Sequence, residues 1–164
     1  MELGEGGKPW TGLCTVVAVD SSSTSYRACG VCERTLSDGA CHYCSRNGFN
    51  PGSCADRRFF RLLISVATPD RVVAVMCFDR VAQGLFGCPA DEFFDFCRVN
   101  PDAAETACRM LEGEPFKMAL TRPRSGSAQH LRVSSMVPLS SEFRPLMELL
   151  KAGRSTPSRM MRTM

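Results

Sequence analysis

In the stretch RFFRLLISVATPDRVVAVMCF (residues 58–78), two apolar runs flank a short polar turn. Large apolar side chains fill every second position from Phe60 to Val66, which is the pattern of a strand with one buried face. Thr-Pro-Asp (68–70) is typical of a turn, and the β-branched run that follows it (71–78) predicts a second strand. The stretch therefore predicts a β-hairpin.

Further elements are expected on both sides of this hairpin. The β-branched run LCTVVAV (13–19) predicts a buried strand before it. After it, residues 79–112 change to the period of amphipathic helices, with glycine and proline at the helix boundaries. Two more strands (115–122 and 130–137) precede an amphipathic C-terminal helix, EFRPLMELLKA (142–152). This order predicts a mainly β protein with helices: an OB-fold, which is a five-stranded Greek-key barrel, followed by a C-terminal helix.

A cysteine cluster occupies the predicted loop between the first and second strands. In CGVCERTLSDGACHYC (29–44) two Cys-x-x-Cys pairs lie eight residues apart, with Asp38-Gly39 as a turn signal between them. Two such pairs can aim four thiolates at one point, and a fully thiolate tetrahedron suits structural zinc because catalytic zinc keeps one position for water. The cluster predicts a zinc ribbon (residues 26–57) that holds one structural ion. The predicted ligands are Cys29, Cys32, Cys41 and Cys44.

Other roles for the cysteines were weighed against this one. A redox pair or a disulfide is less favoured, because no thioredoxin-like strand and helix surround either Cys-x-x-Cys pair. His42 is an alternative ligand and Cys54 an additional one. The remaining cysteines in apolar runs, Cys14, Cys77 and Cys108, are expected to be small core residues.

The composition is that of one domain. The chain has 164 residues, of which 44% are hydrophobic and 23% charged, and no apolar run approaches the roughly 20 residues that cross a bilayer. The segment MELGEGGKPW carries acidic residues and glycines where a signal peptide carries basic and then apolar ones, so we expect no membrane association and reduced cysteines. The expected organisation is a flexible N-terminus (1–12), one OB-fold domain (13–152) and a disordered basic tail (153–164).

No catalytic site can be assembled from the sequence. The chain has two histidines, no glycine-rich phosphate loop and no nucleophile elbow, and the predicted metal has all four positions filled by thiolates. We therefore expect a protein that is not an enzyme.

These features together resemble a known family, the C-terminal DNA-binding domain of the large subunit of replication protein A. Its members are OB-folds with a four-cysteine zinc ribbon in the same loop. The resemblance covers about residues 13–152 and rests on TSYRACGVC, RFFRLLISVA, VMCFDRVAQGLFG and the helix after HLRVSSMVPL. The chain is similar also to the N-terminal region of the DNA-damage-induced apoptosis suppressor. The resemblance implies a nuclear single-stranded DNA-binding module that acts within a complex in replication, repair or recombination.

Basic and aromatic residues concentrate where an OB-fold holds a nucleic-acid strand. The net charge is only +3, but residues 27–61 carry six arginines and three acids, whereas residues 91–114 carry seven acids and two arginines. Arginine pairs with phosphate, and aromatic rings stack on bases for about 1–3 kcal/mol each, whether the strand is DNA or RNA. Packing inside the domain is the competing role for each aromatic ring. The predicted contacts are Tyr43, Arg46, Arg57, Arg58, Phe59, Arg61, Arg122 and Arg124.

The predicted C-terminal helix indicates a second class of function. In the family that the chain resembles, the helix after the last strand assembles a heterotrimer with helices of the sister subunits. The apolar stripe of the helix is accordingly a candidate surface for protein partners, or else it covers one mouth of the barrel. The alternative function is an OB-fold adaptor that assembles through this helix and binds little nucleic acid. The stripe consists of Phe143, Leu146, Met147 and Leu150.

Overall fold

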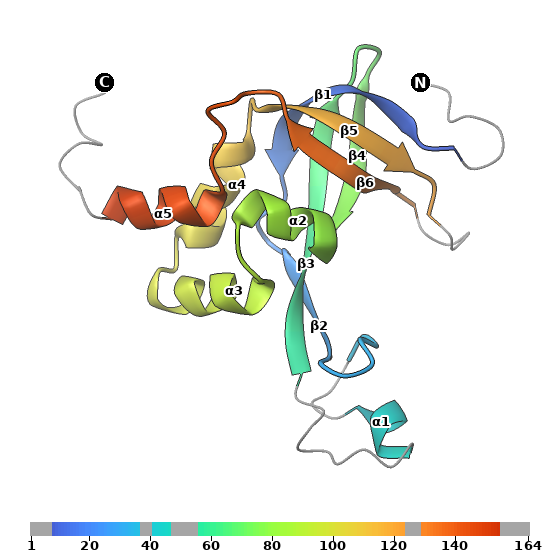
Figure 1. Ribbon diagram of the computed structural model, residues 1–164, viewed down its shortest axis with the longest axis vertical. Helices are drawn as coiled ribbons and strands as arrows, with labels where there is room; N and C mark the ends of the chain where they lie inside the picture. Colours follow the sequence, from blue (N-terminus) through green and yellow to red (C-terminus); the bar gives the residue numbers. More distant parts are fainter. Residues whose placement is uncertain (1–7, 37–40, 47–55, 124–128, 155–164) are drawn as a thin grey trace.

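The computed structural model describes residues 8–36, 41–46, 56–123 and 129–154 (Figure 1). Within them, none of the helices has the length and apolar character needed to cross a membrane. The elements are β1 (Trp10–Val19), β2 (Ser25–Cys29), α1 (His42–Arg46), β3 (Asp56–Ala67), β4 (Val72–Phe78), α2 (Asp79–Phe86), α3 (Ala90–Val99), α4 (Ala103–Leu111), β5 (Pro115–Thr121), β6 (Leu131–Pro138) and α5 (Leu146–Arg154).

Five of the strands close into a ring. β1 pairs with β5, β5 with β6, β6 with β4, β4 with β3, and β3 with β1. Only the short β4–β6 pairing is parallel. β1 has two neighbours: residues 10–15 pair with β5 and residues 15–19 pair with β3, where the register shifts between Val16 and Ala18. This pairing is that of an OB-fold, so the predicted fold class is confirmed.

The inner face of β3 forms the centre of the core, as the alternation predicts. Phe60, Leu62 and Ile64 are completely buried, and the ring of Phe60 stacks on Phe86 of α2 with a centroid separation of 4.4 Å. Phe93 of α3 also packs against Phe60, at 5.8 Å. Each such side chain contributes roughly 1.5–3 kcal/mol by leaving water. The helices α2 and α3 therefore cover the face of β3 that carries its even-numbered residues.

Both ends of the predicted domain differ in detail from the structure. β1 starts at Trp10, inside the segment expected to be flexible, because its first residues pair with the end of β5. α5 continues to Arg154, two residues into the segment expected to be a disordered tail. The rest of that tail, residues 155–164, lies outside the described residues.

The C-terminal helix packs on its own domain. Figure 1 shows α3, α4 and α5 gathered on one side of the strands. Leu146, Met147 and Leu150 are buried in the core, and Phe143 meets Phe116 edge to face at 5.5 Å. The helix begins at Leu146, later than the predicted start at residue 142, since proline cannot occupy a helix interior. The apolar stripe of α5 thus packs on the core of its own domain. This agrees with the second role predicted for it, covering one mouth of the barrel, rather than with a free surface for partners.

Candidate metal centre and nucleic-acid interface

The first residues of β3 extend beyond the ring of strands. This part of β3 carries several of the predicted nucleic-acid contacts. Residues 56–60 pair with β2, from Ser25 opposite Phe60 to Cys29 opposite Asp56. The free backbone N–H groups on the other edge of this segment are satisfied by carboxylates. Asp79 accepts from the Phe60 N–H at 2.9 Å, and Asp91 accepts from the Arg58 N–H at 3.0 Å. The two-stranded extension leads to the cysteine cluster and α1 (Figure 1).

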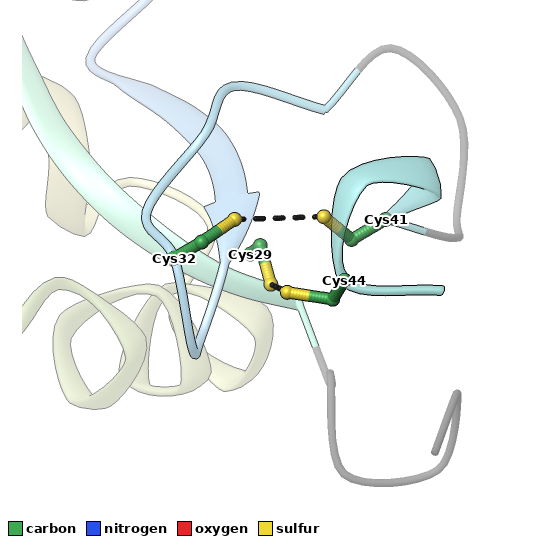
Figure 2. Close-up of side chains that lie close together, drawn as sticks. All are labelled: Cys29, Cys32, Cys41 and Cys44. Carbon is green, nitrogen blue, oxygen red and sulfur yellow. Dashed lines mark hydrogen bonds between the residues drawn. The ribbon is translucent and has the colours of Figure 1, made fainter. Parts of the chain in front are cut away.

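The four predicted cysteine ligands converge on one point. Their sulfur atoms all lie within 4.8 Å of one another. Figure 2 shows Cys29 facing Cys44 and Cys32 facing Cys41, with Sγ–Sγ distances of 3.6 Å in both pairs. A disulfide would hold its sulfurs at about 2.0 Å. A tetrahedron with metal–sulfur bonds of about 2.3 Å has edges of about 3.8 Å, so the cluster has the dimensions of a metal site.

Backbone N–H groups of the first Cys-x-x-Cys turn stabilise the thiolate form of one ligand, Cys29. The Val31 N–H points at the Cys29 sulfur at 3.4 Å. The backbone N–H groups of Cys32 and Val31 lower the pKa of the Cys29 thiol to about 6, which favours the thiolate that binds metals. The turn closes through a hydrogen bond from the Glu33 N–H to the Cys29 carbonyl, and Glu33 has a left-handed φ of 62°.

The other cysteines differ from the cluster in their chemistry. Cys14, Cys77 and Cys108 are buried in the core, as predicted. Burial raises the pKa of Cys77 to about 12 and that of Cys108 to about 11, so both stay protonated. His42 is exposed and is not part of the cluster. The additional candidate ligand, Cys54, lies outside the described residues.

An aromatic pair lies where the two-stranded extension meets the ring. Tyr26 of β2 stands opposite Phe59 of β3 in the register. Their rings stack with a centroid separation of 5.6 Å and an interplanar angle of 25°. The guanidinium of Arg57 lies 5.7 Å from the centre of the Phe59 ring. Both rings are partly exposed, so the pair offers a stacking surface.

A third aromatic residue continues this surface across the ring. Phe78 of β4 stands opposite Arg61 of β3, and Arg61 shares a face with Phe59 because strand side chains alternate. Arg132 of β6 lies over Phe78, with its guanidinium 4.4 Å from the ring centre. Burial raises the pKa of Tyr26, while Arg132 and Arg61 act against this rise. The outer sheet face, as we name it, consists of Tyr26, Phe59, Arg61, Phe78 and Arg132.

Only part of the predicted nucleic-acid set lies on the outer sheet face. Phe59 and Arg61 belong to it. Arg58 points to the opposite side of β3, where its guanidinium lies 5.5 Å from the ring of Phe94. Arg57 is close to Phe59 but also pairs with Asp91, with Nε 3.6 Å from the carboxylate.

The remaining predicted contacts lie at the two ends of the surface. Tyr43 and Arg46 are exposed on α1 beside the metal cluster, and Arg34 stacks 3.7 Å over the Tyr43 ring. Arg122 is exposed directly after β5, whose last residue pairs with Arg132. Arg124 lies outside the described residues.

Sequence reasoning did not select three members of the outer sheet face. Tyr26 is an aromatic candidate in the sequence because it lies among arginines beside the ribbon, but its position opposite Phe59 required knowledge of β2, a five-residue strand without a clear alternating pattern. Phe78 and Arg132 lie at the ends of strands predicted correctly, and their contact depends on the short parallel pairing of β4 with β6. Alternation within the predicted strand 71–78 was the one available signal, since it places Phe78 on the face opposite the buried Cys77.

Two solved structures have an architecture similar to that of this chain. The chain matches a chain of a replication protein A heterotrimer bound to ssDNA with a TM-score of 0.64 and 18% identity, over 99% of this chain and 37% of that one. The fold is that of replication protein A chains. Yeast replication protein A bound to ssDNA matches with the same TM-score and identity, over 96% of this chain and 92% of the other.

The structural likeness confirms, at the level of the fold, the resemblance predicted from the sequence. This chain spans about 37% of the length of the first of these replication protein A chains. No protein-family model and no curated protein matches the sequence. The similarity to the DNA-damage-induced apoptosis suppressor stays a prediction.

Proposed function

We propose that this chain is a single-stranded DNA-binding module of the replication protein A type, and that its four cysteines hold one structural zinc ion. The observation that carries the proposal is the outer sheet face, where stacked aromatic rings lie among arginines on the strands that OB-folds use for oligonucleotides. The solved chains of the same fold are described as bound to ssDNA. A nuclear role in replication, repair or recombination within a complex is part of the proposal.

The outer sheet face has the two kinds of group that a single strand needs. Bases stack on Tyr26, Phe59 and Phe78, and each stack contributes about 1–3 kcal/mol. Arg61 and Arg132 lie beside these rings and pair with the phosphates between the stacked bases. Such contacts make binding weaken as salt rises, because the arginines displace counterions from the strand.

The metal cluster has a supporting role in this proposal. Zinc bound to four thiolates supplies structural cross-linking and no free position for chemistry. Cys29 is the last residue of β2 and Tyr26 lies three residues earlier, so fixing the cysteines fixes the end of the strand that carries Tyr26. We assign the module no catalytic activity.

Fluorescence anisotropy with a labelled oligo(dT) of about 30 nucleotides tests DNA binding directly. The zinc-loaded chain should bind, and the affinity should fall steeply between low and physiological salt. Phe59→Ala and Arg61→Ala should each weaken binding, by about fivefold or more for the aromatic residue. Arg109→Ala is the matched control for Arg61→Ala, because Arg109 is also an exposed arginine and lies on α4. Absence of binding at low salt would refute the proposal, and an oligo(rU) titration shows whether RNA is also bound.

Metal analysis tests the zinc assignment separately. One zinc per chain should copurify, and cobalt substitution should give the intense thiolate bands of a tetrahedral site. Cys41→Ser should lower the zinc content, whereas Cys97→Ser, outside the cluster, should leave it unchanged. Full zinc content in Cys41→Ser would contradict the assignment.

The alternative function, an adaptor that assembles through the stripe of α5, is not favoured by the contacts. Leu146, Met147 and Leu150 are already buried in the core of this chain. A partner would have to displace the helix to reach them.

A further inference from the structure

A cavity of about 270 Å³ lies between α3, α4 and α5. α3 packs on the face of β3 that carries Phe60, opposite the face of Phe59 and Arg61. None of the residues of the outer sheet face lines the cavity. The cavity is therefore separate from the proposed nucleic-acid surface.

The wall of the cavity is mostly apolar and partly exposed. Phe96 and Val99 of α3, Met110 of α4 and Leu149 of α5 contribute to it. Val99 is 77% exposed, the highest value for a large hydrophobic side chain among the described residues. A cavity of this kind, with an exposed aliphatic side chain at its mouth, is typical of a surface that a partner covers.

One polar group on the wall also lacks a partner in the described part of the chain. Asn100 donates from Nδ2 to the Phe96 carbonyl at 2.9 Å, but its Oδ1 is buried without a hydrogen bond. A buried acceptor that is left unsatisfied costs about 1–3 kcal/mol. A donor from a bound molecule would remove this cost.

The charge around the cavity determines which partner suits it. Residues 91–114, which include α4 and most of α3, carry seven carboxylates and two arginines. Arg98 pairs with Asp95 at 2.5 Å and Arg109 with Glu105 at 2.6 Å, and Lys151 of α5 pairs with Glu92 at 3.7 Å. With Glu148, Lys151 and Arg154 of α5 included, there are eight carboxylates and four basic residues, so the surroundings stay acidic. Asp102 lies on the cavity wall itself. The surroundings repel nucleic acid and attract a basic partner.

We propose that this cavity is the docking site for a basic amphipathic helix of a partner protein. Apolar side chains spaced at i, i+3, i+4 and i+7 enter between Val99, Met110 and Leu149, in the way that helices bind in apolar grooves. Lysines or arginines beside this stripe pair with the carboxylates of α3 and α4, and one of them donates to Asn100 Oδ1 after the side chain of Asn100 turns this buried atom toward the cavity. Because the cavity and the outer sheet face are separate, the partner and a nucleic-acid strand bind at the same time.

Two synthetic peptides test this proposal. One is a fluorescein-labelled helix of about 18 residues, with leucines on one stripe and lysines elsewhere; the other replaces every lysine by glutamate. Measured by anisotropy against the full zinc-loaded chain, the lysine peptide should bind at least about tenfold more tightly than the glutamate peptide. In methyl NMR spectra the lysine peptide should shift Met110 and leave Met118 of the ring core unchanged.

A pair of exposed valines supplies the matched variants. Val99→Lys should weaken binding of the lysine peptide by about tenfold, since it places a positive charge at the apolar mouth. Val72→Lys, at the start of β4 and 60% exposed before substitution, should leave it unchanged. Val99→Lys should not alter the affinity for oligo(dT).

Four results would overturn the proposal. Equal loss of peptide binding in Val99→Lys and Val72→Lys, or equal binding of the lysine and glutamate peptides, would show that the peptide binds non-specifically. Loss of peptide binding in Phe59→Ala, measured without DNA, would place the peptide on the outer sheet face. Concentration-dependent dimerisation that Val99→Lys abolishes would assign the cavity to a second copy of the chain. If oligo(dT) does not bind but the peptide results hold, the proposed function fails and this inference stands.

Discussion

Gly87 shows how one residue joins two distant parts of the chain. It ends α2 with a left-handed φ of 76° and donates its N–H to the Gln83 carbonyl. A Cβ at this position would lie 2.5 Å from the Cβ of Pro145, the residue before α5. Glycine is therefore required both by the backbone conformation and by the close approach of the C-terminal segment.

Gly87→Ala should destabilise the domain by about 1–3 kcal/mol, because it adds left-handed strain and a steric clash. Gly84→Ala in the same helix is the control: a Cβ there meets nothing within 4 Å, and alanine should stabilise the helix by up to about 1 kcal/mol. Urea unfolding measures both. Similar midpoints for the two variants would contradict the argument.

Glu33 is the one residue other than glycine with a positive φ among the described residues. The turn after Cys32 requires this conformation, in which side chains with a Cβ cost roughly 1–2 kcal/mol. Glu33→Gly should raise the affinity for zinc, and Glu33→Val should lower it, because a β-branched residue tolerates the conformation least. Competition with a chelator measures both affinities. Equal affinity of the glycine and valine variants would show that the turn carries no strain.

At the scale of the elements, the two faces of β3 have different neighbours. Phe59 and Arg61 belong to the outer sheet face, whereas Arg58 and Phe60 point to the helices α2 and α3. Arg57 and Arg58 are neighbours in the sequence, yet Arg58 lies on Phe94 while Arg57 is shared between Phe59 and Asp91. A cluster of arginines in a strand is therefore not one binding surface.

Asp91→Asn should strengthen oligo(dT) binding. The substitution keeps an oxygen that accepts the Arg58 N–H, but it removes the charge that holds Arg57. Exposed ion pairs contribute about 0.2–1 kcal/mol, so the expected gain at low salt is about two- to fivefold and should vanish at high salt. Asp95→Asn removes the partner of Arg98 on the same helix and should have no effect. Equal gains in both variants would indicate net charge alone.

Prediction of the elements succeeded where a local pattern was strong. The alternation from Phe60 to Val66 and the run 71–78 gave the central hairpin, and the order of the strands gave the OB-fold. β2 was missed because SYRAC has neither alternation nor length and is held in place by pairing with β3. α1 was missed as well, since its five residues are fixed by the convergence of Cys41 and Cys44 on the cluster.

At the scale of the whole molecule, the residues that the structure describes form two hydrophobic clusters. The large one fills the ring and reaches the helices, and the small one consists of cysteines with Leu36. The small cluster is too limited to stabilise the extension of β2 and β3 by burial alone. Metal binding is therefore expected to supply that part of the folding free energy.

Removing zinc should unfold the extension and leave the ring intact. Hydrogen exchange should show lost protection at residues 25–29, with residues 60–66 still protected because Phe60 is bound to the core and its N–H to Asp79. Oligo(dT) binding should weaken by about as much as in Tyr26→Ala, because the stacking pair depends on β2. The Tyr26→Ala substitution should then have no additional effect in the zinc-free protein. Global unfolding on chelation would contradict this separation of the two clusters.

The amino-acid sequence by itself determined the order of the strands, the inner face of β3 and the four cysteines of the cluster. These depend on spacing within short segments, where a period of two or a Cys-x-x-Cys turn fixes which side chains point together. Only the tertiary structure decided that Tyr26 stacks on Phe59, that Arg132 covers Phe78, that Arg58 turns away and that the stripe of α5 is buried. Each of these depends on the register between segments far apart in the chain, because alternation defines the face of a residue but not its neighbour on that face.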